Sequence, residues 1–539
     1  MSNSKQHSNT GSSGKRTSKL KRYLKGLFWL VVALLGVVAA VYFVEERRGL
    51  AAWSEFVSEW EAKGERFDLG AYVPEEIPAE ENLAATPLFA ELFEISEAHP
   101  DWFSPYSVTR PSDPSALGRL ALISTAIGRY HRDSSDRWLN PDLPTGWRGA
   151  RARQLNAITV FQEEGSPAIP EKEAAAKLRA VVDHSCASDW SALMEDTKGK
   201  QFVPPIDWGK PSEQWMTSFA YFQTMSAHIS LRCAALLTLE TNAPELAFEE
   251  WEFGMRLADF PKNYGLAGHV LYRNGVAIQL TPLWEGAMRH QWTGLQLLRA
   301  QETLAELADG LGSNLLRCIR FERNLTLHVL LDDHQRAETF SRMPNSEGRT
   351  GAFLRFPKGW VFQNALTICR PLQNYFLSKA DGSLEREVLN MDRAVDWYNE
   401  LGGIASARLH PYHVLAVNGL ISPEYPERAL AFEQELRVFV TGLACERYYL
   451  REGKFPESLD ALAPDYLDAI PLDSVTGKPL HYRQHPDGSP VIWAIGSNRI
   501  DNGGLPHSDA ESGDVVWQYR LSDALMKREE ELEAEGRKP

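Results

Sequence analysis

The chain has 539 residues, with 57 lysines and arginines against 72 aspartates and glutamates, so its formal net charge is −15. An acidic chain repels phosphate, which argues against a nucleic-acid partner. Five cysteines in 539 residues exclude a small scaffold held by disulfides, and a hydrophobic fraction of 43% excludes a wholly disordered chain. The length allows about three domains.

The strongest signal near the N-terminus is an uncharged apolar segment at residues 26–44, GLFWLVVALLGVVAAVYFV. As a helix it would span about 28 Å, close to the ~30 Å hydrocarbon core of a bilayer. A cleaved signal peptide is the alternative, but its apolar region would be shorter and would end in a small-residue cleavage site. No second stretch is comparable, so the sequence predicts one transmembrane helix that contacts the lipid bilayer through residues 26–44.

The flank before this segment sets the expected topology. Residues 1–25 carry seven lysines and arginines and no acidic residue, and their Ser, Gly and Lys content predicts a disordered basic tail. Cytoplasmic flanks of membrane helices are enriched in basic residues. We therefore expect this tail in the cytoplasm and the rest of the chain on the other side of the membrane.

Beyond the membrane segment the chain is expected to be mainly α-helical. Residues 45–210 predict a stalk helix and then a loop-rich region, in which the prolines of residues 74–88 favour an extended segment that covers another surface. In residues 211–440 apolar side chains recur every three or four positions between short joints. This pattern favours stacked antiparallel helices in an α-solenoid-like domain, although no clean 34-residue period repeats. Residues 521–539 read as a charged tail.

Aromatic residues of the helical domain fit two interpretations. Their helical spacing favours core packing, whereas a solenoid could use them to line a peptide-binding groove. The residues are Trp215, Phe219, Phe222, Trp251, Trp284 and Trp292.

A small α+β module is predicted at residues 441–520. The segments 480–484 and 491–496 alternate like strands, and the sequence His-Pro-Asp-Gly between them is typical of a hairpin turn. A helix over residues 424–452 precedes them.

The module resembles the C-terminal globular part of the major pseudopilins of type II secretion systems. Phe455-Pro456 follows the long helix, Leu459 and Leu462 match a short Leu-x-x-Leu helix, and a Gly/Asp-rich loop follows at 496–504. The chain differs from that family because its apolar segment lacks a processing site and lies far from the module, so a piston subunit is not implied. The matching turn contains Ile470, Pro471, Asp473, Gly477, Pro479 and Tyr482.

The whole chain resembles a group of uncharacterised membrane-anchored proteins of planctomycetes and verrucomicrobia, through Trp60–Leu69 and Pro74–Leu88. This resemblance implies a Gram-negative type of envelope and no particular activity. With the topology above, it implies an inner-membrane protein whose C-terminal domain lies in the periplasm.

The pseudopilin resemblance also implies a calcium site, because major pseudopilins bind calcium in the loop before a tryptophan, here Trp517. Calcium prefers six to eight oxygen ligands, which aspartates and backbone carbonyls supply. The spacing differs from the family at residues 510–513, so a solvated Asn/Gly-rich turn is the alternative. The candidate ligands are Asn498, Asp501, Asp509 and Asp514.

Other reactive side chains carry weaker signals. The histidine clusters at 332–334 and 410–413 lack a metal-site pattern and read as surface or core residues. No Cys-x-x-Cys pair occurs, and Cys233 and Cys445 lie in apolar helical patterns that predict buried thiols.

No catalytic motif stands out. We therefore expect a non-catalytic scaffold that binds another envelope protein, in connection with a secretion or pilus-like assembly. The alternative is a hydrolase of envelope polymers whose site is assembled from residues scattered along the chain.

Overall fold

The structure is a computed structural model, and it divides the chain into two compact units. Unit 1 comprises Met1–Asp68, Thr326–Pro371 and Tyr398–Leu420, and unit 2 comprises Leu69–Leu325, Leu372–Trp397 and Ile421–Pro539. The described residues are 13–87, 89–90, 93, 176, 190–206, 208, 225–226, 229–230, 232–233, 236–237, 244–333, 357–377, 424–496, 499–504 and 513–519. The charged tail predicted at 521–539 and most of the loop-rich region lie outside them.

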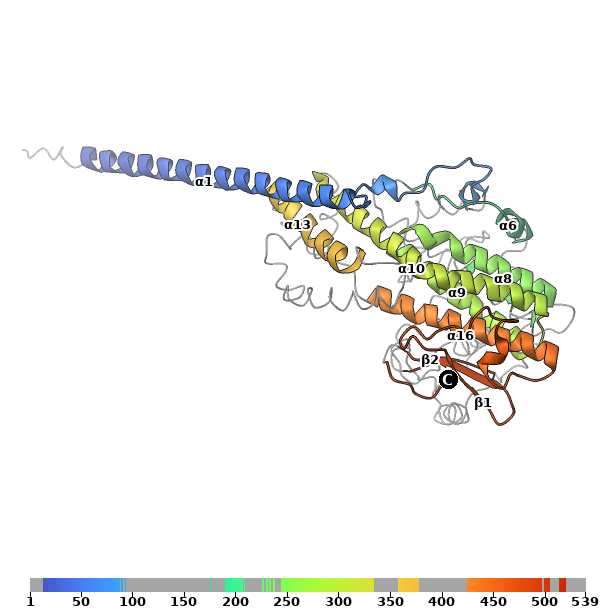
Figure 1. Cartoon of the computed structure of the whole chain (residues 1–539). Helices are drawn as coiled ribbons and strands as arrows, with labels where there is room; N and C mark the ends of the chain where they lie inside the picture. Colours follow the sequence, from blue (N-terminus) through green and yellow to red (C-terminus); the bar gives the residue numbers. More distant parts are fainter. Residues whose placement is uncertain are drawn as a thin grey trace, which may run out of the picture. The chain divides into compact units, whose positions relative to one another are not determined.

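Helix α1 (Ser13–Glu61) dominates unit 1 and joins the predicted membrane segment and stalk without a break (Figure 1). It is long and apolar enough to cross a membrane, and none of its most apolar 18-residue window is buried. The helix ends at Glu61, and Gly64 follows with a φ of +94°, a left-handed conformation that glycine adopts without strain.

The start of α1 differs from the prediction of a disordered tail. The helix begins at Ser13, so residues 13–25 are helical, while residues 1–12 lie outside the described part. Lysine, arginine and leucine dominate this stretch and are good helix formers, and no proline interrupts it.

Helix α13 (Lys358–Pro371) packs on α1 just beyond the apolar segment, through two glycines. A Cβ on Gly359 would lie 1.8 Å from the carbonyl oxygen of Glu45, and a Cβ on Gly49 would lie 2.2 Å from that of Gly359. No other residue type allows the two backbones to approach so closely.

Unit 2 contains a helical body of α8 (Pro244–Asp259), α9 (Gly265–Met288) and α10 (Gly294–Leu331). The 3₁₀ helix η4 (Phe260–Asn263) joins α8 to α9, which pack against each other. The unit boundary falls within α10, so this helix contributes residues to both units. Long helices with short joints agree with the predicted mainly α fold, and the solenoid arrangement stays a prediction.

The aromatic side chains of this body belong to its core. Trp251, Trp284 and Trp292 are all at most 4% exposed, so packing accounts for them and they do not line an open groove. Trp215, Phe219 and Phe222 lie outside the described residues.

The segment of residues 74–88, predicted to be extended, is not extended throughout. Residues 74–78 form no regular element, a turn occupies 79–81, and the 3₁₀ helix η2 (Leu83–Ala85) follows, while residue 88 lies outside the described part. The segment is tied to residues 201–203 by a β-bridge between Asn82 and Gln201 and by hydrogen bonds. The Asn82 amide donates to the Val203 carbonyl at 2.9 Å, and its Oδ1 accepts from the Val203 N–H at 3.0 Å. Leu83 and neighbouring residues enter a buried cluster with Phe202 and Phe253. The short elements here and nearby are η1 (Leu69–Ala71), η2 (Leu83–Ala85), α6 (Trp190–Asp196) and η5 (Leu372–Phe376).

The C-terminal module packs a three-stranded antiparallel sheet on helix α16 (Glu424–Glu452) (Figure 1). The sheet order is β1 (His481–Gln484), β2 (Pro490–Ala494) and β3 (Val515–Gln518), so the predicted hairpin is confirmed. The predicted Leu-x-x-Leu helix forms as η8 (Leu459–Leu462). Gly442 on α16 leaves room for the Trp517 ring, which would lie 2.3 Å from an added Cβ.

Candidate functional site

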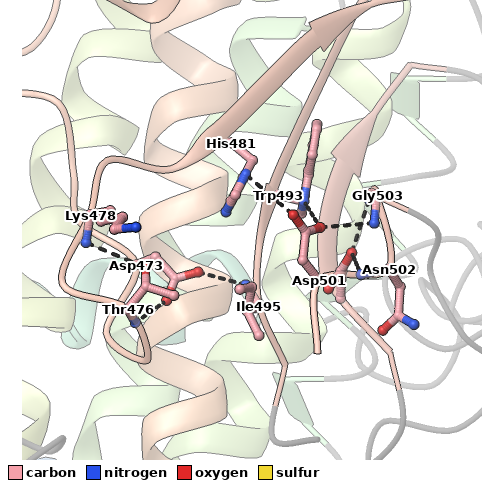
Figure 2. Close-up of polar contacts among 11 residues, drawn as sticks. Asp473, Thr476, Lys478, His481, Trp493, Ile495, Asp501, Asn502 and Gly503 are labelled. Carbon is pink, nitrogen blue, oxygen red and sulfur yellow. Dashed lines mark hydrogen bonds and ion pairs between the residues drawn. The ribbon is translucent and has the colours of Figure 1, made fainter. Parts of the chain in front are cut away.

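A buried aspartate fixes the turn that supports the candidate metal loop. Oδ1 of Asp473 accepts from the N–H group of Val475 at 2.8 Å. The same oxygen accepts from the N–H group of Thr476 at 2.9 Å (Figure 2). Oδ2 of Asp473 accepts from the N–H of Ile495 at 2.7 Å. One side chain therefore ties the turn to the end of β2, where the candidate loop begins.

Asp501 is held in this loop by N–H donors. Its Oδ1 accepts from the Trp493 indole at 3.0 Å and from the Gly503 N–H at 2.9 Å (Figure 2). Nδ1 of His481 lies 3.7 Å from its Oδ2. The hydrogen bond from Gly503 and then that from Trp493 lower the pKa of Asp501, because they favour the charged form.

Asp514 lies in the same loop region, and its pKa shifts in the opposite direction. Its Oδ2 accepts from the N–H groups of Asn502 at 3.0 Å and Gly504 at 2.9 Å, whereas its Oδ1 is buried and has no hydrogen-bond partner among the described residues. Burial raises the pKa of Asp514, and the negative charge of Asp501 adds to this effect. An unpaired carboxylate oxygen beside a second carboxylate is an electrostatic setting in which a cation would be stabilising.

The two ends of the loop meet at a close backbone contact. A Cβ on Gly496 would lie 1.9 Å from the carbonyl oxygen of Gly513. This contact helps to bring Asp514 back beside Asp501.

The structure thus brings together two of the four predicted calcium ligands. Asp501 and Asp514 share the loop, while Asn498 and Asp509 lie outside the described residues. Within the described ranges, no group of three or more His, Cys, Asp or Glu side chains is placed to hold a metal ion. The residues present fit part of a calcium site, in which backbone carbonyls and water would have to supply most of the oxygens.

A second polar cluster joins three distant parts of unit 2, and the sequence analysis missed it. Nδ1 of His290 lies 2.7 Å from Oε1 of Glu446, and the Tyr519 hydroxyl donates to Oε2 of Glu446 at 2.6 Å. These residues come from the turn just after α9, from α16 and from the position after β3. Glu446 is fully buried, and burial raises its pKa against the opposing hydrogen bonds.

The His290 ring is held by Glu446 and by an aromatic neighbour. It stacks on Tyr449 with ring centroids 4.4 Å apart, and its backbone has a φ of 53°, which is uncommon for a residue other than glycine. The side chain remains 38% exposed. A carboxylate that binds one imidazole nitrogen fixes the ring and its tautomer, which is how general-base histidines are oriented.

The other candidate side chains that the structure describes are in an ion pair or in the core. Asp333 lies 3.7 Å from the Lys358 ammonium, while His334 and residues 410–413 lie outside the described part. Cys233 and Cys445 are buried as predicted, and burial raises the pKa of each thiol.

Comparisons of the chain with protein-family models, with curated proteins and with solved structures find no match. The pseudopilin likeness therefore rests on the module residues quoted from the sequence.

The two loop aspartates should respond to pH with opposite sign. The fold raises the pKa of Asp514, so the protonated side chain stabilises the fold below about pH 4, where aspartate ordinarily titrates. This stabilisation is lost as pH rises through the pKa of Asp514 in the folded protein. Asp514→Asn should therefore gain melting temperature relative to the unmodified chain between pH 4 and pH 7, by about 1–3 °C.

Asp501→Asn is the matched comparison. In the unmodified chain the pKa of Asp501 is lowered, so its carboxylate stabilises the fold above about pH 4. This stabilisation is lost as pH falls through the pKa of Asp501 in the folded protein. This variant should lose melting temperature relative to the unmodified chain as pH rises from 3 to 5. Thermal melts in detergent with a chelator measure both differences, and equal pH profiles for the two variants would contradict the assignment.

Proposed function

We propose that the chain is a single-pass inner-membrane protein whose periplasmic part is a non-catalytic scaffold that binds another envelope protein. The observation that carries the proposal is the fully exposed apolar window of α1, which water solvates poorly and a bilayer solvates well. The basic residues before it favour a cytoplasmic N-terminus.

The scaffold part is supported by the architecture of the exported region. It contains a well-packed helical body and a small sheet module, and some apolar side chains of the module remain exposed. Leu472 and Ile500 of the module are 51% and 59% exposed, and burying them against a partner would be favourable. The module's resemblance to pseudopilins, which act in an assembly, supports a link to a secretion or pilus-like system.

Binding of a partner protein should therefore depend on the side chains of Leu472 and Ile500. The tagged full chain is cross-linked in its native envelope and purified beside a Leu472→Ser/Ile500→Ser double variant. A defined protein should be enriched with the unmodified chain and reduced at least fivefold with the double variant. Leu450→Ser, on an α16 residue that is 41% exposed, serves as the control. Absence of any partner above a tag-only sample argues against the scaffold.

We further propose that the loop at Asp501 and Asp514 binds calcium. The unpaired, buried Oδ1 of Asp514 beside the Asp501 carboxylate is the feature that supports it. Calcium would supply the positive charge that this pair lacks, and its affinity would suit millimolar extracellular concentrations.

Calorimetric titration of calcium into the chelator-treated full chain in detergent tests this site. Binding with a dissociation constant of about 10⁻⁴–10⁻³ M is expected, and Asp501→Asn and Asp514→Asn should each weaken it at least tenfold. Asp468→Asn, at an exposed position of the same module, should leave it unchanged. Binding that survives both loop variants would place the calcium elsewhere.

The cluster of His290, Glu446 and Tyr519 favours a second candidate function, a hydrolase with a site made of scattered residues. His290 would act as the general base and Glu446 would orient it. Hydrolysis of p-nitrophenyl acetate by the full chain probes this role. His290→Gln should lower the rate at least tenfold and His481→Gln should not; equal rates for His290→Gln and the unmodified chain would exclude the dyad.

A further inference from the structure

The level at which α1 would leave the bilayer can be followed along the helix. Apolar residues end at Val44, and a rise of about 1.5 Å per residue puts Glu45 about 1.5 Å and Gly49 about 8 Å beyond it. The headgroup layer outside the hydrocarbon core is about 5–8 Å thick on each side. The residues Glu45 to Gly49 would therefore cross the headgroup layer.

The first turn of α13 lies at this level, because it touches this part of α1 directly. Gly359 packs on the backbone of Glu45, with no side chain between them. The Trp360 indole donates to Oε2 of Glu45 at 3.1 Å. Both contacts lie within unit 1, so they fix the start of α13 relative to the end of the apolar segment.

The side chains at this level are of the kinds that favour a membrane interface. Lys358 is 64% exposed, Trp360 is half-buried, and the guanidinium of Arg47 lies 5.3 Å from the ring centroid of Phe43, one turn back in the apolar segment. Tryptophan rings favour the interface, and long cationic side chains reach lipid phosphates. Leu50, 45% exposed, extends the apolar surface on the same stretch of α1.

We propose that the N-terminal end of α13 is a second membrane-contacting element, with Lys358 and Trp360 in the phospholipid headgroup layer on the ectodomain side. This inference rests on the proposed transmembrane placement of α1. Charge at this level is mixed, since Glu46 is nearby on α1 and Asp333 lies 3.7 Å from Lys358. The surface therefore fits zwitterionic phospholipid and does not require an anionic one.

A fluorophore at Lys358 tests the contact in the full chain. A Cys186→Ser background is used, because the four described cysteines are buried and should not be labelled under native conditions. Lys358→Cys is labelled with an environment-sensitive dye and reconstituted into phosphatidylcholine vesicles that contain nitroxide lipids. The reference is Lys454→Cys, since Lys454 has a similar exposure of 67% and, like Lys358, a carboxylate at 3.7 Å.

Quenching of the Lys358 label should be at least threefold stronger than that of the Lys454 label. It should be stronger with the nitroxide near the headgroup than with one deep in the acyl chain. Equal quenching of the two labels overturns the inference.

A third label separates this inference from the proposal on which it rests. Val37→Cys lies in the middle of the apolar segment and should be quenched most by the deep nitroxide. A quenched Val37 label with an unquenched Lys358 label overturns only the α13 contact. An unquenched Val37 label overturns the transmembrane placement of α1 and, with it, the α13 contact.

Discussion

The exposed apolar surface of α1 is the constraint on which the rest of the interpretation depends. Each residue from 26 to 44 lies on the outside of the chain, and no described segment covers the most apolar window. A helix satisfies its own backbone hydrogen bonds, so such a surface is stable in a bilayer and unstable in water. The proposed position of α13 at the membrane surface depends on this helix lying in a membrane.

Helix α1 packs closely on helix α13, backbone against backbone. The glycines Gly49 and Gly359 bring α1 and α13 together immediately beyond the apolar segment, and Trp360 adds a hydrogen bond to Glu45. Packing at this separation is stiff, because any side chain larger than hydrogen would force the helices apart. Unit 1 therefore has a close-packed helix pair immediately beyond the apolar segment.

In the module, buried carboxylates organise the backbone in two different ways. Asp473 has its oxygens satisfied by three N–H groups and joins a turn to β2. Asp514 has one oxygen that accepts two hydrogen bonds and one that is buried with no partner in the described part of the chain. The first arrangement is complete as it stands, whereas the second leaves one buried oxygen without a hydrogen-bond partner among the described residues.

Local patterns in the sequence determined the apolar helix, the long helix of 424–452 and the hairpin around residues 485–488, because each depends on residues that are near neighbours in the chain. The helical start at Ser13 was not predicted, since composition suggested disorder while propensity favoured a helix. Of the candidate metal site, the sequence indicated Asp501 and Asp514 but not the opposite directions of their pKa shifts, which depend on burial and N–H donors.

Only the tertiary structure decided the contacts between distant residues. His290 and Glu446 are separated by 156 positions, and nothing in either local pattern relates them. The sequence likewise does not indicate the contact between Gly49 and Gly359. Glycine is unfavourable within an isolated helix, and its role here depends on the helix packed against it. Periodicity and composition are local properties of the chain, whereas these sites arise from packing between elements.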